Sequence, residues 1–151
     1  LVIAAIEDLR DQRAKLERFL DLGCGSGILS IAAARLWPEA RGAAIDVDPE
    51  ATECSQENFE RNAVSRVDVK TGSLQDAVAV FDLVMANIQA DVLQTLAPGF
   101  SQRLAPGGWL VLSGLLTSDV SAIEECYRQA GFAVVARRED GEWAAITLTR
   151  D

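Results

Sequence analysis

The stretch FLDLGCGSGILSIAAARL, residues 19–36, decides how this chain folds. The apolar run over 19–23 predicts a strand, and the helix formers over 28–37 predict a helix that follows directly. Three glycines separate them at every second place: Gly23, Gly25 and Gly27. Glycine tolerates positive φ and lets a backbone approach a ligand closely, while the start of a helix favours a carboxylate or phosphate. The stretch therefore predicts a strand–turn–helix unit that binds a ligand.

The same alternation of strand and helix continues along the chain. Apolar runs predict further strands over 41–47, 67–73, 81–88 and 109–116. Helices are predicted over 2–17, 49–62, 118–130 and 89–104, the last interrupted near Pro98-Gly99. Pro106-Gly107-Gly108 predicts a turn, and 132–140 with 142–150 a terminal hairpin. This order predicts a single α/β domain over 1–151, Rossmann-like, with a mostly parallel sheet, an antiparallel terminal hairpin and helices on both faces.

Composition excludes several classes of function. The 151 residues hold no histidine and only three widely spaced cysteines, so we expect no metal site, disulfide framework or Ser-His pair. A net charge of −9, with Arg137-Arg138 as the tightest basic grouping, argues against nucleic acid and favours a basic partner, although plain solubility explains the charge equally well. No apolar run approaches the roughly 20 residues of a membrane span. No secretory leader is visible in a chain that begins at Leu1, and we expect a cytoplasmic protein.

The spacing of the glycines separates two classes of ligand. A dinucleotide-binding turn follows G-x-G-x-x-G, and its third glycine would fall on Ile28. The spacing here is G-x-G-x-G with Asp21 before it, which resembles the cofactor loop of class I S-adenosylmethionine-dependent methyltransferases. A purely structural tight turn is the alternative interpretation, and Cys24 within the loop is interpreted as a small filler.

A second acidic position follows the next strand, which ends in AIDVDP. An acidic residue at such a strand end can accept hydrogen bonds from the hydroxyls of a ribose, and we assign Asp46 to that role. Asp48 precedes Pro49, a pattern typical of a helix N-cap. After the third strand, where many class I methyltransferases carry an aspartate that meets adenine, this chain has Ser73, with Asp76 slightly later. The adenine contact therefore stays open.

Asn87, in MANIQADVL, lies at the carboxyl end of the fourth predicted strand, where it is well placed for a site; capping the next segment is the alternative. Taken with the segments around it, the chain resembles one family along nearly its whole length. The segments are DLGCGSGILSIAAARL, AIDVDPEATECSQENFERNAV, FDLVMANIQADVLQTLAP, APGGWLVLSGLL and GEWAAITLTR. In this order they resemble the catalytic domain of ribosomal protein L11 methyltransferase, with ANI, LSGLL and the late EW as the more specific parts.

The resemblance implies a function and a set of site residues. It implies transfer of a methyl group from S-adenosylmethionine to amino groups, chiefly lysine, of ribosomal protein L11, with Asn87 beside the transferred methyl. The cofactor-binding positions it implies are Asp21, Gly23, Cys24, Gly25, Ser26, Gly27, Asp46, Val47, Ser73, Leu74 and Asn87. The tryptophans at 37, 109 and 143 could line a lysine channel, although at least two of them are expected to serve packing.

Two family features have no counterpart here: a separate N-terminal domain that recognises L11, and a threonine-containing segment just before the first helix. The chain is thus either a trimmed catalytic domain or a relative with another substrate. A class I methyltransferase for a small molecule or RNA, and a non-catalytic cofactor-binding module, remain alternatives.

Overall fold

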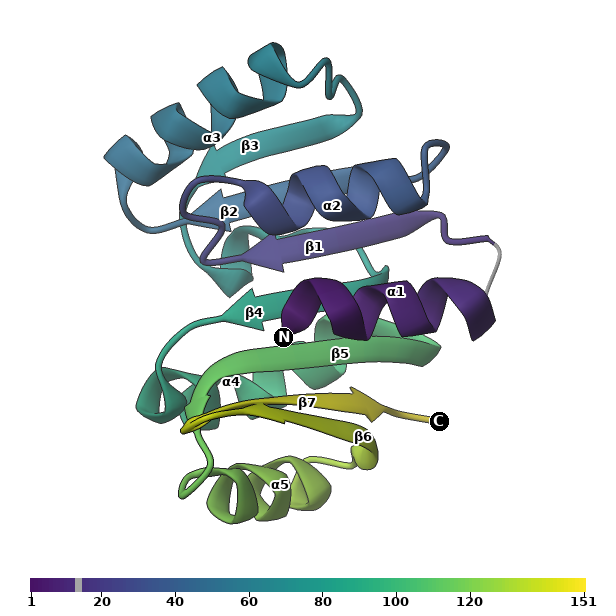
Figure 1. Ribbon diagram of the computed structural model, residues 1–151, viewed down its shortest axis with the longest axis vertical. Helices are drawn as coiled ribbons and strands as arrows, with labels where there is room; N and C mark the ends of the chain where they lie inside the picture. The colour runs from purple at the N-terminus through teal and green to yellow at the C-terminus, as the bar shows by residue number, and fades with distance from the viewer. Residues whose placement is uncertain (13–14) are drawn as a thin grey trace.

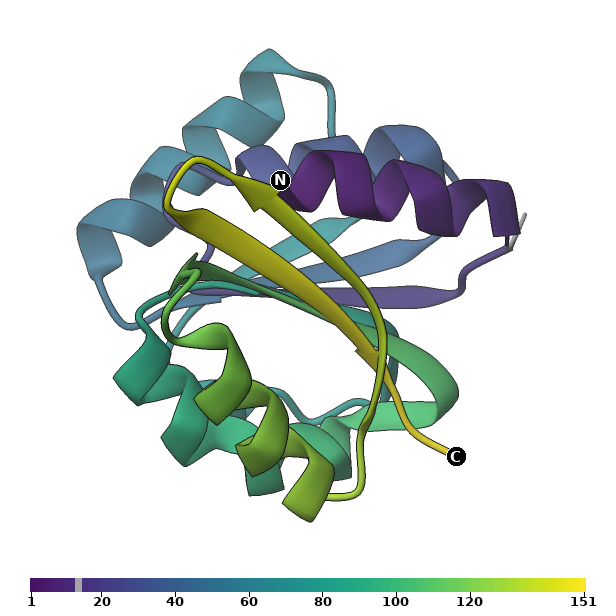
Figure 2. The same ribbon diagram turned by 60° about the horizontal axis from the view of Figure 1, so that its bottom comes forward.

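A computed structural model describes residues 1–12 and 15–151, with one sheet between two layers of helices (Figures 1 and 2). The strands are β1 (Arg18–Leu22), β2 (Arg41–Asp46), β3 (Val67–Thr71), β4 (Phe81–Asn87), β5 (Leu104–Leu116), β6 (Ala133–Asp140) and β7 (Trp143–Thr149). The helices are α1 (Val2–Gln12), α2 (Ile28–Leu36), α3 (Pro49–Arg61), α4 (Ala90–Arg103) and α5 (Val120–Gln129), with a short 3-10 helix η1 (Leu74–Asp76) that the sequence did not indicate.

The strand order β3-β2-β1-β4-β5-β7-β6 confirms the predicted fold class. The first five strands in this order are parallel, and β7 runs antiparallel to both β5 and β6. Because the chain winds outward from β1 to β3 and then returns to β4, the order reverses between β1 and β4. Leu22, at the end of β1, is in register with Ile45 on β2 and Ala86 on β4. The carboxyl ends of these strands therefore meet at a topological switch point, where open α/β sheets bind ligands.

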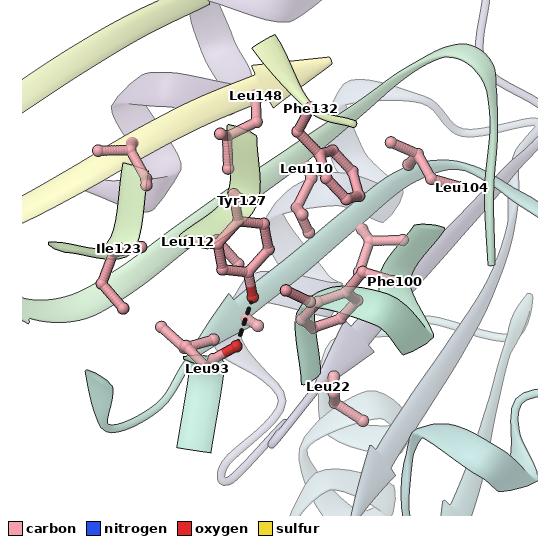
Figure 3. Packing of buried hydrophobic residues seen from close by; sticks show 14 of the residues in the cluster. Leu22, Leu93, Phe100, Leu104, Leu110, Leu112, Ile123, Tyr127, Phe132 and Leu148 are labelled. Carbon is pink, nitrogen blue, oxygen red and sulfur yellow. Dashed lines mark hydrogen bonds between the residues drawn. The ribbon is translucent and has the colours of Figure 1, made fainter. Parts of the chain in front are cut away.

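Each face of the sheet buries its own hydrophobic core. Phe19 faces the layer of α1, α2 and α3, whereas its neighbour Leu20 faces α4 and α5, as the two-residue period of a strand requires. In the second core, the Tyr127 ring packs against Phe100 and Phe132, and its hydroxyl donates to the Leu93 carbonyl at 2.7 Å (Figure 3). That bond satisfies the polar atom that the buried ring brings into the core.

Three segments differ from the sequence-based expectation. α1 ends at Gln12; residues 13 and 14 lie outside the described residues, and 15–17 are not helical, although Leu16 is buried in the core. β5 begins at Leu104, because the Pro-Gly-Gly segment predicted as a turn continues the strand with a register shift against β4.

α4 is the third difference, since it runs unbroken through Pro98 where an interruption was predicted. A helical proline leaves the carbonyl four residues earlier without its N–H donor. Here that carbonyl belongs to Gln94, and the Cys126 thiol of α5 approaches it at 3.6 Å. Packing against α5 thus offsets a local signal for a break.

Candidate active site

The glycine turn lies at the carboxyl end of β1 with all three glycines at positive φ: 72° at Gly23, 54° at Gly25 and 81° at Gly27. A Cβ at Gly23 would lie 2.4 Å from Ile88 Cγ2, and one at Gly27 would lie 2.6 Å from Phe59 Cε1. A Cβ at Gly25 would meet nothing within 4 Å, so this position needs glycine for its backbone conformation alone. The turn therefore needs glycine for its left-handed backbone and, at Gly23 and Gly27, also because neighbouring side chains leave no room for a Cβ.

Asp46 connects the glycine turn to the end of β2. Its Oδ2 accepts from Gly25 N–H and its Oδ1 from Asp48 N–H, both at 3.0 Å. Asp48 caps α3 by accepting from Glu50 N–H at 2.9 Å, as its place before proline predicted. Each Asp46 oxygen can accept a second donor, because an ionised carboxylate offers about four lone-pair positions. The backbone bonds thus fix the carboxylate and leave it able to bind a pair of hydroxyls.

Two residues of α3, Ser55 and Asn58, hold the glycine turn from the other side. Ser55 Oγ donates to the Gly25 carbonyl at 2.8 Å, and Asn58 Nδ2 donates to the Ser26 carbonyl at 2.8 Å. Sequence reasoning attended only to the acidic, solvated face of this helix and missed both residues. Their three-residue spacing places them on one helix face, which was the available signal.

Asp21 lies behind the glycine turn and lines neither of the hollows described below. Its side chain is buried, and its Oδ2 accepts from both the Ser30 N–H, at 3.0 Å, and the Ser30 hydroxyl, at 2.7 Å. Its Oδ1 is buried with no hydrogen-bond partner among the described residues. Burial raises the pKa of this carboxyl to about 6, against the lowering effect of the Ser30 bonds. Asp21 fixes the start of α2, and through it the turn.

Cys24 is buried in the core of α1, α2 and α3 and does not line the hollows described below. Its Sγ lies 3.3 Å from Ser55 Oγ, and burial raises the pKa of the thiol to about 11. A thiol with that pKa is almost wholly protonated at neutral pH, which fits a packing role rather than a nucleophile.

A hollow of about 420 Å³ opens beside the glycine turn. The predicted residues among its lining are Gly23, Asp46, Val47, Ser73 and Leu74. The sequence reasoning missed its apolar far wall, formed by Ile88, Val92 and Leu96, with Gln89 beside them. Ile88, Gln89 and Val92 lie within five residues of Asn87, so their position just after β4 was the available sequence signal. Cys24, Gly25, Ser26 and Gly27 shape the turn without lining this hollow.

The short helix η1 shows what the Asp76 side chain binds. The Asp76 Oδ2 accepts from the Ser73 N–H at 2.8 Å, and this bond lowers the pKa of the exposed carboxyl. Asp76 therefore folds back to cap its own turn, while Ser73 and Leu74 face the hollow.

A second hollow of about 660 Å³ lies on the other side of Ile88. Asn87 lines it, exposed at the end of β4, together with Ser113, Asp140 and Trp143. Ile88 and Gln89 line both hollows and form their shared wall. Of the three tryptophans, the buried Trp37 and the half-buried Trp109 line neither hollow. Trp143 lines the second hollow and is 50 % exposed.

The shared wall is positioned by close packing on two sides. Ile88 N–H donates to the Ser113 carbonyl at 3.2 Å. A Cβ at Gly114, which has a φ of 78°, would lie 2.6 Å from the Ile88 carbonyl oxygen. Gly23 and Gly114 therefore let two strands close on Ile88 from opposite sides.

Comparison with known proteins shows the family to which this chain belongs. The family model described as ribosomal protein L11 methyltransferase matches residues 1–151. The chain belongs to this family. A ribosomal protein L11 methyltransferase of Geotalea uraniireducens is 44% identical over 128 residues, covering 84% of this chain and 40% of the relative. That of Gloeobacter violaceus is 37% identical over 147 residues, covering 97% of this chain and 45% of the relative. The chain thus spans about two fifths of the length of the curated relatives it matches.

Solved structures agree with the family assignment. A ribosomal protein L11 methylase from Lactobacillus delbrueckii subsp. bulgaricus superposes with a TM-score of 0.89 at 29% identity, covering 98% of this chain and 77% of that one. An RNA methyltransferase from Salinibacter ruber, in complex with S-adenosyl-L-homocysteine, has a TM-score of 0.78 at 22% identity, covering 99% and 91%. The second likeness shows the shared fold alone.

Within residues 1–12 and 15–151, no helix has the length and apolarity needed to cross a membrane. The same residues hold no cluster of three or more side chains suited to a metal ion.

Proposed function

We propose that this chain transfers a methyl group from S-adenosylmethionine to lysine amino groups of ribosomal protein L11, in the cytoplasm. Membership of the family supports the reaction class. The observation that carries the proposal is the pair of hollows at the switch point, separated only by Ile88 and Gln89. One contains the fixed carboxylate of Asp46, and the other contains the exposed amide of Asn87. A cofactor and an acceptor can thus bind in adjacent hollows at the ends of neighbouring strands.

The first hollow fits the adenosine part of the cofactor. Asp46 offers unused lone pairs to the ribose hydroxyls, and the apolar walls from Leu74, Ile88 and Val92 suit a flat base. The glycine turn brings the backbone close enough for the methionine part to lie at the start of α2. The cofactor supplies an activated methyl group on a sulfonium, so the protein itself has to bind and orient.

Asn87 is proposed to orient the amine. A lysine amine with a pKa near ~10.4 must lose a proton before it can attack, which costs roughly 4–5 kcal/mol at neutral pH. A hollow with low dielectric lowers that pKa. The Asn87 amide oxygen can accept an N–H from the neutral amine and so orient its lone pair toward the methyl group of a bound cofactor. Neither role requires a histidine.

The charge of the carboxyl edge suits a basic protein substrate. Asp48 and Asp119 are the N-caps of α3 and α5, Asp91 lies in the first turn of α4, and Asp140 lines the second hollow. The carboxylates of Asp48, Asp91 and Asp119 stabilise the helix starts, and together with Asp140 they place negative charge around the entrance. A lysine-rich surface is attracted by such an edge, more strongly at low salt.

Two measurements test the proposal. Calorimetry with S-adenosylmethionine and S-adenosylhomocysteine, with NAD as a control, should give micromolar binding of the first two alone. Incubation with L11 and the cofactor should then increase the mass of L11 by about 14 Da per transferred methyl group, because a CH₃ group replaces one hydrogen. Mass spectrometry measures this increase. Binding without methylation of L11 would leave a cofactor-binding module or another acceptor; absence of binding would reject the proposal.

A further inference from the structure

The amino edge of the sheet, opposite the candidate active site, gathers cations that are scattered in the sequence. Two adjoining hollows of about 550 and 560 Å³ lie along it and share Pro38 and Ala40. Their lining contains six cations, which we call the basic band: Arg10, Lys15, Arg18, Arg35, Arg41 and Arg66. Of the residues that the structure describes, two carboxylates line the same hollows, Glu17 and Glu39. This surface is positive in a chain whose net charge is −9.

The winding of the fold explains why these residues converge. In Figure 1 the parallel strands point to the left, and α1, α2 and α3 return to the right, so helix ends and strand starts meet at one edge. Arg10 and Arg35 lie in the last turns of α1 and α2, while Arg18 and Arg41 begin β1 and β2. Arg10, Lys15 and Arg18 are close in the sequence but have acidic residues among them, whereas Arg35, Arg41 and Arg66 join them only through the fold.

Helix dipoles account for only part of the band. An arginine in the last turn of a helix offsets the partial negative charge there, which suffices for Arg10 and Arg35. Arg18 and Arg41 are not in helices, and they are direct register partners on adjacent parallel strands. Both are exposed, and strands lie about 4.8 Å apart, so the two like charges repel. Both arginines also line a neighbouring hollow that contains Asp68 and Asp76, but an anion bound between the two guanidinium groups would offset their repulsion directly.

The cations of the band are also available for a ligand. Among the described residues, only Arg66 is in an ion pair, with Glu39 at 3.6 Å. Neutral acceptors hold two others in place: Arg10 Nε donates to the Leu36 carbonyl at 2.9 Å, and Arg35 Nη2 donates to Asn62 Oδ1 at 3.2 Å. Such bonds orient a guanidinium without neutralising its charge.

We propose that the basic band binds the phosphodiester backbone of a folded RNA. The band extends over two hollows and several elements, so its charges match a chain of phosphates better than one small anion. Planar guanidinium groups bind phosphate oxygens with paired donors. The choice of RNA among polyanions rests on the proposed function, whose substrate is a ribosomal protein. Because the carboxyl edge is acidic, RNA held at the amino edge leaves the candidate active site facing away and free for the protein substrate.

The test measures fluorescence anisotropy of a labelled RNA hairpin at several KCl concentrations, without cofactor or L11. The wild-type chain should bind with a salt slope of about −3 to −5, equivalent to four to six phosphate contacts. The double variant Arg18→Gln/Arg41→Gln should weaken binding about 10-fold at low salt and reduce the slope by about 2. Cofactor affinity of this variant should be unchanged, because neither arginine lines the two hollows of the carboxyl edge.

The matched control is Arg103→Gln/Arg128→Gln, which changes the net charge equally in the last turns of α4 and α5. This control should alter RNA binding less than 2-fold, since neither arginine belongs to the band. Equal weakening by both variants, or no RNA binding by the wild type at low salt, would overturn the proposal. Polyglutamate that competes as well as unlabelled RNA would assign the band to an acidic protein instead. Since cofactor binding and methylation of L11 are measured separately, a failure here is distinct from failure of the proposed function.

Discussion

The two turns beside the switch point are built in opposite ways. The turn after β1, residues 23–27, is held by the side chains of Asp46, Ser55 and Asn58, which bond to its backbone. The turn after β4 begins with Asn87, whose exposed side chain forms no hydrogen bond with the described residues. A binding site gains affinity when its groups are ordered beforehand, whereas a group that meets the reacting atoms must still have a free donor or acceptor. This difference supports our proposal that the first turn binds the cofactor and that Asn87 orients the acceptor.

The strongest test of that division is Asn87→Ala. Methyl transfer should fall by about 10²–10³-fold, comparable to the loss of one positioned polar group in other active sites, while cofactor affinity changes less than about 3-fold. Ser113→Ala is the matched control, because Ser113 lines the same hollow but donates its hydroxyl to the Ala144 carbonyl at 3.1 Å. Single-turnover kinetics and calorimetry measure the two quantities. Equal losses in binding and transfer would make Asn87 a cofactor ligand and remove the distinction between the turns.

Asp21→Asn tests the buried anchor of the first turn. The pKa of Asp21 is about 6 in the folded protein and near ~3.9 when unfolded, so the folded state binds the proton more tightly between these values. Stability should therefore fall as pH rises through this window, by roughly 3 kcal/mol from this group. In the variant that contribution disappears, and the difference in unfolding free energy between variant and wild type should change with pH from about 4 to 7.

Urea unfolding at a series of pH values measures this difference. The exposed Asp68→Asn on β3 serves as the control for the loss of one surface carboxylate. A flat difference for Asp21→Asn would mean that the Asp21 carboxyl titrates normally despite its burial.

Asp46→Ala should weaken binding of S-adenosylhomocysteine by about 10- to 100-fold, since a hydrogen bond to a charged group contributes about 1.5–3 kcal/mol. The rate of transfer at saturating cofactor should fall much less. Asp48→Asn provides the comparison, because asparagine is also a good N-cap and Asp48 does not line the first hollow. Calorimetry measures both variants, and similar affinities for the two would remove the ribose role of Asp46.

Ser55→Ala should have the smallest effect. It removes the donor to the Gly25 carbonyl, which should lower cofactor affinity by about 3- to 10-fold, corresponding to about 0.5–1.5 kcal/mol for a neutral hydrogen bond. The neighbouring Gln56→Ala, whose exposed amide bonds Glu60 on the same helix, should leave affinity unchanged. Unchanged affinity in Ser55→Ala would show that the turn keeps its shape without the Ser55 hydrogen bond.

The sequence indicated the fold class and most of the first hollow because those signals are local. Glycines at every second place, a strand end at Asp46 and the Asp48-Pro49 start of α3 each act through the conformation of a few neighbouring residues. The wall of Ile88 and Val92 was missed because it is formed by the segment after β4 and the start of α4 rather than by the glycine turn. Residues that merely support a turn, such as Ser55, carry no local signature of their target.

By itself, then, the sequence determined the order of strands and helices, the left-handed turn and the acidic residue beside it, since backbone preference and hydrophobic period are properties of short segments. Only the tertiary structure decided that α4 continues through Pro98 and that Asn87 faces a different hollow from Asp46. It also brought Arg18 and Arg41 together from two strands to form part of the basic band. These outcomes depend on contacts between residues that are distant in the chain, and such contacts follow from the winding of the sheet.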